Sequence, residues 1–159
     1  PKILQWRFVV DCPDARHIVL CENLNFLKTP RIARDNHIEL WYVGGNNISN
    51  IDYIPDHKLT LPLYYSCDWD YDGLKIYERL QDRFARKSKS ITLLYPSPIL
   101  RKSVDSPEHN SRWKHDQPFS GLIRSAYSQE AISLIQDLIA QDEWVEEETC
   151  ELIEMVKLT

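Results

Sequence analysis

Short apolar runs alternate with amphipathic segments along this chain. Residues 17–21 form a nearly continuous apolar run that stops at Glu22 and Asn23, a pattern typical of a strand buried on both faces. In the segment 74–87, apolar residues recur at helical spacing while charged residues fill the other face. Read in this way, the chain predicts strands over 17–21, 38–43, 63–67 and 91–95, and helices over 24–34 (interrupted by Pro30), 74–87, 128–141 and about 146–157.

Alternation of strands and helices at these lengths predicts an α/β fold with a mostly parallel, four-stranded sheet and helices on both faces. We expect a single domain over 1–159, with a core at about 17–95 and a C-terminal helical extension at about 128–157. The segment 99–127 between them is irregular in sequence, and its clear features are Trp113, Pro118 and Gly121.

Composition is that of an ordinary globular domain, with 43% hydrophobic and 27% charged residues among 159. No stretch approaches the roughly 20 apolar residues of a membrane span, and the N-terminus lacks a secretory signal pattern. We therefore expect a soluble, cytoplasmic protein with no membrane partner. Because the chain begins at Pro1 and contains one methionine, Met155, we expect it to be a piece of a longer protein. Cys21 and Cys67 lie in apolar runs and are predicted to be buried free thiols.

The net charge of −5 arises in the acidic tail, because residues 1–141 hold 18 bases against 17 acids. Clustering of bases matters more for a nucleic-acid partner than their sum. One cluster exists, which is either a solvated helix face or a phosphate-binding surface: Arg79, Arg83, Arg86, Lys87 and Lys89.

Carboxylates follow two of the predicted strands. Glu22 ends the first strand, and Asp68, Asp70 and Asp72 follow the third. Ligands of open parallel sheets bind beyond the carboxyl ends of the strands, and Mg²⁺ prefers oxygen ligands. The pattern predicts a divalent metal site at this edge, with Asp72 either a ligand or a helix cap. A calcium EF-hand is excluded because the twelfth position counted from Asp68 is Arg79 rather than glutamate.

A glutamate ending one strand and a DxD ending another resembles the Toprim domain of topoisomerases, primases and nucleases. The resemblance covers about residues 17–95. It implies a Toprim-like α/β fold, bound Mg²⁺ or Mn²⁺, and Glu22, Asp68 and Asp70 as the catalytic, metal-holding acids.

Longer motifs resemble the C-terminal Toprim-like nuclease domain of the JetD subunit of Wadjet anti-plasmid systems, itself similar to the topoisomerase VI catalytic subunit. These motifs are VLCENLNFLKTP, YVGG, YYSCDWDYDGLKIYERL, SQEAISLIQDLI and VEEET. The chain departs from that family at Asp72, where a histidine is expected, and at Glu147, where the family has glutamine. Glu148 either supplies a further carboxylate to a second metal or belongs to a solvated helix face.

The resemblance implies a metal-dependent endonuclease domain that cleaves plasmid or foreign DNA in bacterial defence. It further implies an SMC-like, condensin-type complex as partner, and a homodimer is a further expectation. One or two ions would activate a water for attack on phosphorus. Basic side chains would contact the flanking DNA phosphates, namely those of Arg31, Arg34, Arg79, Arg83, Arg86 and Lys87.

Three alternatives remain open at this point. A topoisomerase VI-like module would assist a tyrosine nucleophile in another domain. A phosphoryl-transfer or receiver domain would need paired acids after the first strand and a lysine after a later one, whereas here Asn23 follows Glu22 and Pro96 ends the fourth strand. A degenerate Toprim module would bind a partner and cut nothing.

Overall fold

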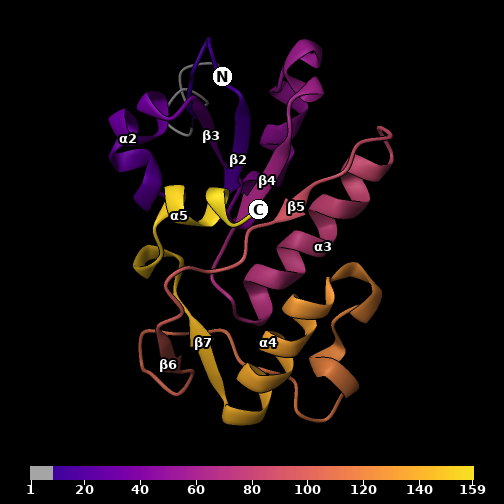
Figure 1. Cartoon of the computed structure of the whole chain (residues 1–159). Coiled ribbons are helices and arrows are strands. Elements are labelled where there is room, and N and C mark those ends of the chain that lie inside the picture. The colour runs from indigo at the N-terminus through magenta and orange to yellow at the C-terminus, as the bar shows by residue number, and fades with distance from the viewer. Residues whose placement is uncertain (1–8) are drawn as a thin grey trace.

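A five-stranded sheet forms the centre of the molecule (Figure 1). The structure is a computed structural model that describes residues 9–159, except the side chains of 45–47. The strand order is β1-β3-β2-β4-β5, parallel except for β1, which pairs antiparallel with β3. The mostly parallel α/β sheet is confirmed, with one strand more than expected. The strands are β1 (Val9–Val10), β2 (His17–Cys21), β3 (Ile38–Tyr42), β4 (Leu63–Ser66) and β5 (Thr92–Leu93).

The first and third apolar runs form neighbouring strands of the sheet. β2 pairs with β4 in a parallel register that sets Ile18 opposite Leu63 and Cys21 opposite Ser66. β2 is central, and Ile18 to Cys21 are fully buried because the strand is covered on both faces. The two strands therefore end side by side.

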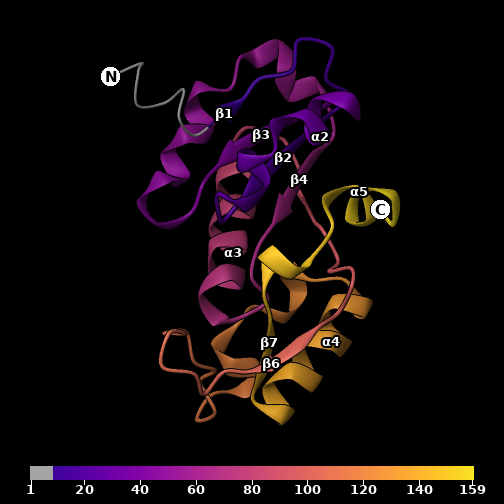
Figure 2. The ribbon, with the colours of Figure 1, turned by 90° about the vertical axis from the view of Figure 1, so that its left-hand side faces the viewer.

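Helices cover both faces of the sheet, as Figure 2 shows for α2 (Pro30–Asp35) and α3 (Tyr71–Ala85). The connections β2-α2-β3 and β4-α3-β5 run toward opposite edges, and right-handed crossovers then place their helices on opposite faces. The helix predicted over 24–34 is divided into a 3₁₀ helix at Asn25–Lys28 and α2. Pro30 begins α2 because proline is tolerated in a first helical turn.

α3 begins three residues earlier than predicted. Asp70 is its N-cap, and the Asp70 Oδ1 atom accepts a hydrogen bond of 2.8 Å from the Gly73 N–H. Asp72 lies in the first turn, so it is not the cap. Asp68 therefore belongs to the segment that follows β4, whereas Asp70 caps α3.

The C-terminal part of the chain packs below the sheet as α4 (Gln129–Gln141) and a two-stranded sheet of β6 (Arg101–Ser103) and β7 (Glu143–Val145). The prediction of an acidic helix over 146–157 is wrong for the first half of that segment, where a 3₁₀ turn at Glu147–Thr149 precedes α5 (Leu152–Lys157). The backbone of Val145 pairs with that of Trp69, which keeps the chain extended there. The remaining 3₁₀ helices are Gly45–Tyr53, Asp56–Thr60, Pro118–Gly121 and Arg124–Ala126.

One cluster of buried apolar side chains joins the sheet to the C-terminal elements, from Val10 to Met155. Its largest fully buried members include Trp69, Tyr65 and Phe84. Cys21 and Cys67 are buried free thiols, as predicted. No helix within residues 9–159 is long and apolar enough to cross a membrane.

Candidate functional site

The candidate site lies between β2 and β4, where the connections that follow the two strands run toward opposite edges of the sheet. It is at such a switch point that open α/β sheets bind ligands in a crevice beyond the carboxyl ends of the strands. Glu22 follows β2 directly, and Asp68 follows β4 after one intervening residue. The fold therefore brings together two acids that are 46 residues apart in the sequence.

Glu22 and Asp68 are in direct contact. The backbone N–H of Asp68 donates to Glu22 Oε1 at 2.9 Å. Asp68 Oδ1 in turn accepts from the backbone N–H of Glu147 at 2.8 Å and from the Asn23 side-chain amide at 3.2 Å. Across residues 9–159, the other carboxylate oxygens of the two acids, Oε2 and Oδ2, take part in no hydrogen bond. Each acid thus has one oxygen that fixes its orientation and one that is available to a ligand.

Two glycines make this close approach possible. A Cβ atom on Gly44 would lie 1.9 Å from the Glu22 carbonyl oxygen. A Cβ atom on Gly73 would lie 2.2 Å from the Asp68 carbonyl oxygen and 2.8 Å from Glu22 Oε1. Any larger residue at these positions would displace the backbone that carries the two acids.

A third carboxylate comes from Glu147, not from the predicted Glu148. Glu147 is fully buried, and its Oε1 atom accepts from the Asn23 backbone N–H at 2.9 Å. Within the described residues, neither its buried Oε2 atom nor the Ser66 hydroxyl makes a hydrogen bond of good geometry, although Ser66 is close enough to lower the pKa of Glu147. The 3₁₀ turn buries Glu147 and leaves Glu148 exposed, so the structure does not bring Glu148 together with the other acids.

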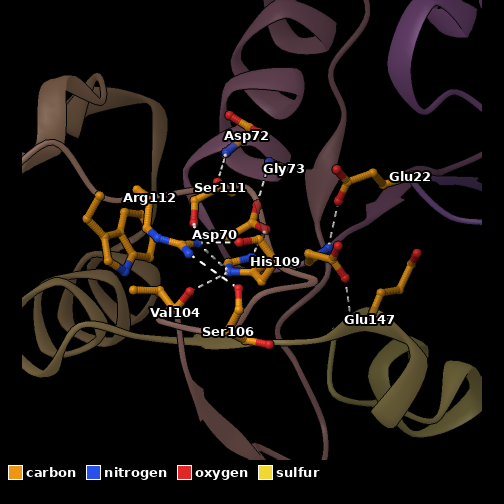
Figure 3. Close-up of polar contacts among 12 residues, drawn as sticks. Glu22, Asp70, Asp72, Gly73, Val104, Ser106, His109, Ser111, Arg112 and Glu147 are labelled. Atoms are coloured by element: carbon orange, nitrogen blue, oxygen red, sulfur yellow. Dashed lines mark hydrogen bonds and ion pairs between the residues drawn. The ribbon is translucent and has the colours of Figure 1, made fainter.

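Asp70 faces a histidine from a distant segment (Figure 3). Asp70 Oδ2 lies 2.9 Å from His109 Nε2, and both side chains are at least nine-tenths buried. The His109 ring stacks on Trp144 with centroids 3.8 Å apart and an interplanar angle of 9°. Sequence reasoning missed His109 because it lies in the irregular segment 99–127, where no periodicity or motif marks it.

Asp72 does not join the other acids. Its side chain is exposed, and its backbone N–H donates to the Ser111 hydroxyl at 3.0 Å. Its charge adds to the raised pKa of Asp70, but within residues 9–159 no hydrogen bond joins the Asp72 carboxylate to Glu22, Asp68 or Asp70. Its prediction as a metal ligand is therefore not supported by this arrangement.

Burial and mutual repulsion perturb the ionisation of these acids. Burial, and next the charges of Asp68 and Asp70, raise the pKa of Glu22 to about 9. Burial likewise raises the pKa of Asp68 to about 6, although the Glu147 N–H opposes this. The pKa of Glu147 is raised to about 8 by burial, with the charge of Asp68 adding to it. A cation at this edge would favour the charged forms and relieve the repulsion.

The chemistry of the donor set fits a hard divalent cation. The free oxygens of Glu22 and Asp68 are carboxylate oxygens at one edge, and the unpartnered Glu147 Oε2 is a further buried acceptor close to them. Mg²⁺ is commonly held by one or two carboxylates, with waters and substrate phosphate completing the shell. In the part of the chain that the structure describes, no three His, Cys, Asp or Glu side chains already converge in coordinating geometry.

The predicted phosphate-contacting bases do not gather at this site. Arg83 and Lys87 lie near the C-terminal end of α3, about 20 Å along the helix from the capping Asp70. Several of these bases also have acidic neighbours: Arg83 and Lys87 with Asp52, Arg86 with Asp82, and Arg34 with Asp11. Arg31 and Arg79 are exposed.

Tyrosines beside the site have structural partners. The Tyr65 hydroxyl donates to the Gly73 carbonyl at 3.1 Å, and the Tyr77 hydroxyl donates to the Ala126 carbonyl at 3.3 Å. Both side chains are buried. They serve the core, as aromatic residues beside a parallel sheet commonly do.

Comparison of the chain with protein-family models gives no match. Comparisons with curated proteins and with solved structures also give none.

Proposed function

We propose that this chain is a Toprim-type nuclease domain that cleaves the phosphodiester backbone of DNA with a divalent cation, Mg²⁺ or Mn²⁺. One observation carries the proposal: Glu22 and Asp68 meet at the switch point of the sheet, and each keeps one oxygen free. This is where open α/β sheets bind ligands. The Toprim-like motifs independently assign the same two acids to metal binding.

The protein contributes orientation and charge. Asn23 and the Glu147 N–H fix one oxygen of Asp68, so its other oxygen is presented toward the crevice. The Asp68 N–H fixes Glu22 in the same manner. Bound to these oxygens, a divalent ion would neutralise phosphate charge and lower the pKa of a water nucleophile. Without the ion, the same acids would repel a phosphate.

The biological setting in this proposal follows the family resemblance. A JetD-like domain would act on plasmid or foreign DNA, together with an SMC-like, condensin-type complex. The bases near the C-terminal end of α3 would then contact DNA beyond the scissile phosphate, since they lie away from the carboxylates. Phosphate contacts of this kind contribute affinity without requiring the protein to have a net positive charge.

A plasmid-nicking assay tests the proposal. The purified protein is incubated with supercoiled plasmid and Mg²⁺ or Mn²⁺, and Glu22→Gln and Asp68→Asn are compared with the wild type. Both variants keep an oxygen acceptor but lose the charge, so cleavage should fall by about 100-fold or more. Asp35→Asn, at an exposed position at the end of α2, is the matched control and should cut like the wild type.

Two results would contradict the proposal. One is metal-dependent nicking at the wild-type rate by both site variants, after contaminating nuclease has been excluded. The other is wild-type protein, tested together with its genomic partners, that never cuts DNA. The second result would favour the binding-module alternative.

A further inference from the structure

Asp70 differs from Glu22 and Asp68 in that both of its carboxylate oxygens are already engaged. Oδ1 accepts from the Gly73 N–H at 2.8 Å, and Oδ2 lies 2.9 Å from His109 Nε2. We infer that His109 is a positioning residue: it holds Asp70 as the cap of α3 and so keeps it out of the ligand set, leaving Glu22 and Asp68 to hold the ion. This inference rests on the proposed function, because it concerns the ligands of the same site.

His109 is itself fixed from several directions. Its ring lies flat on Trp144 of β7, and its Nδ1 atom is 3.3 Å from the Val104 carbonyl. The Arg112 guanidinium donates to the backbone carbonyls of His109 and Ser111. Figure 3 shows Val104 and Arg112 beside His109 on the side away from Glu22. The imidazole therefore cannot follow Asp70 if that carboxylate turns toward the crevice.

Turning the Asp70 carboxylate toward a metal in the crevice would break buried contacts. Asp70 is 4% exposed and His109 is 9% exposed, so neither would find water in place of the lost partner without opening the loop. The Gly73 N–H would also lose its acceptor in the first turn of α3. Glu22 and Asp68 can each offer a free oxygen without breaking any of these contacts.

Two neighbouring Asp→Asn substitutions test which acids bind the ion. Mn²⁺ is titrated calorimetrically into the wild type, Asp68→Asn and Asp70→Asn, in the absence of DNA. At position 70, asparagine keeps the acceptor for the Gly73 N–H, and its amide can donate to His109 Nε2. We expect Asp68→Asn to weaken Mn²⁺ binding at least tenfold and Asp70→Asn to change it by less than threefold.

The possible failures can be distinguished. Equal weakening by Asp70→Asn and Asp68→Asn would make Asp70 a ligand, which would refute the inference and leave the proposed function intact. Wild-type protein that binds no Mn²⁺ would overturn the proposed function, and the inference with it. Thermal melts without metal establish that each variant is folded before it is titrated.

The positioning role of His109 has its own test. In His109→Ala, Asp70 Oδ2 is released, so Mn²⁺ affinity should rise by threefold or more. The same substitution in an Asp70→Asn background should change nothing, which separates positioning from a general loss of structure. His109→Gln, which retains an N–H for Asp70, should keep wild-type affinity. If the alanine variant does not fold, His109→Phe replaces it, because a phenyl ring can keep the stacking on Trp144 but offers no N–H to Asp70, and the same rise in affinity is expected. The positioning role would be refuted if His109→Ala bound Mn²⁺ with wild-type affinity. It would also be refuted if the substitution raised Mn²⁺ affinity equally in the wild-type and the Asp70→Asn backgrounds.

Discussion

Replacing Glu22 by glutamine should stabilise the metal-free protein near neutral pH. Glutamine has the same shape, and its side-chain oxygen can still accept from the Asp68 N–H. Glutamine cannot ionise, whereas the ionised form of Glu22 is disfavoured in the folded state by burial and by the carboxylates of Asp68 and Asp70. The substitution therefore removes an electrostatic cost and keeps the hydrogen bond.

The size of this effect follows from the pKa of Glu22, which is about 9 in the folded protein against 4.5 for an ordinary glutamate. Between these values the unfolded chain has released a proton that the folded protein retains, so stability falls as the pH rises. The slope for one group is about 1.4 kcal/mol per pH unit. At pH 7, about 2.5 units above the unfolded value, the cost is roughly 3 kcal/mol. Glu147 and Asp68, whose pKa values are also raised, add slopes of the same sign.

The assay is thermal unfolding from pH 5 to 9 in the presence of a chelator. At pH 7 the midpoint for Glu22→Gln should exceed that of the wild type by about 6–12 °C, and the gap should narrow toward pH 5. Glu148→Gln is the matched control, because it makes the same change at an exposed neighbour of the site and should melt like the wild type. Mn²⁺ should raise the midpoint of the wild type more than that of Glu22→Gln. A Glu22→Gln protein that is less stable than the wild type at pH 7, or wild-type stability that rises through this window, would refute the electrostatic reasoning.

Two further substitutions test the geometry of the site. Gly73→Ala should destabilise the protein by about 1–2 kcal/mol in urea unfolding, because the clash of the new Cβ with the Asp68 carbonyl outweighs a helix-propensity gain of about 1 kcal/mol. A variant more stable than the wild type would contradict the close approach of residue 73 to the Asp68 backbone. At about pH 4, where the raised pKa of Glu147 costs little stability, Glu147→Ala should cost about 2 kcal/mol, since the part-buried Asn23 N–H loses its acceptor, whereas Glu148→Ala should stay within about 0.5 kcal/mol. Similar effects of the two glutamate variants would be inconsistent with the 3₁₀ turn that separates their environments.

The central fold could be predicted because its signals are local. A continuous apolar run such as 17–21 can bury all its side chains only where both faces of the strand are covered, which indicates a central parallel strand. The amphipathic pattern of α3 is equally direct. β1 has two residues, and β6 and β7 have three each, so they carry too little periodicity to be seen. The turn at Glu147 was missed because backbone contacts with a distant segment override the helical composition of the acidic tail.

The site was predictable only as far as it follows from strand order. Glu22 and Asp68 end neighbouring strands, so the topology alone brings them together. His109 and Glu147 reach the site through loops of irregular sequence, and no spacing rule links them to the strands. Asp70 shows the limit of the DxD pattern: its backbone is still extended, as alternation assumes, but it is also the N-cap of α3, and its two oxygens are engaged by Gly73 and His109.

The C-terminal segment completes the site rather than merely following it. Asp68 Oδ1 takes its strongest hydrogen bond from the backbone of Glu147, 79 residues later in the sequence. The paired backbones of Trp69 and Val145 hold that segment in place, and Trp144 beside them supports the His109 ring. An acid at a sheet edge would otherwise sample several rotamers, and each would direct its free oxygen differently. The orientation of the candidate ligand therefore depends on the folding of the whole chain, and substitutions in β7 should weaken metal binding without altering any carboxylate.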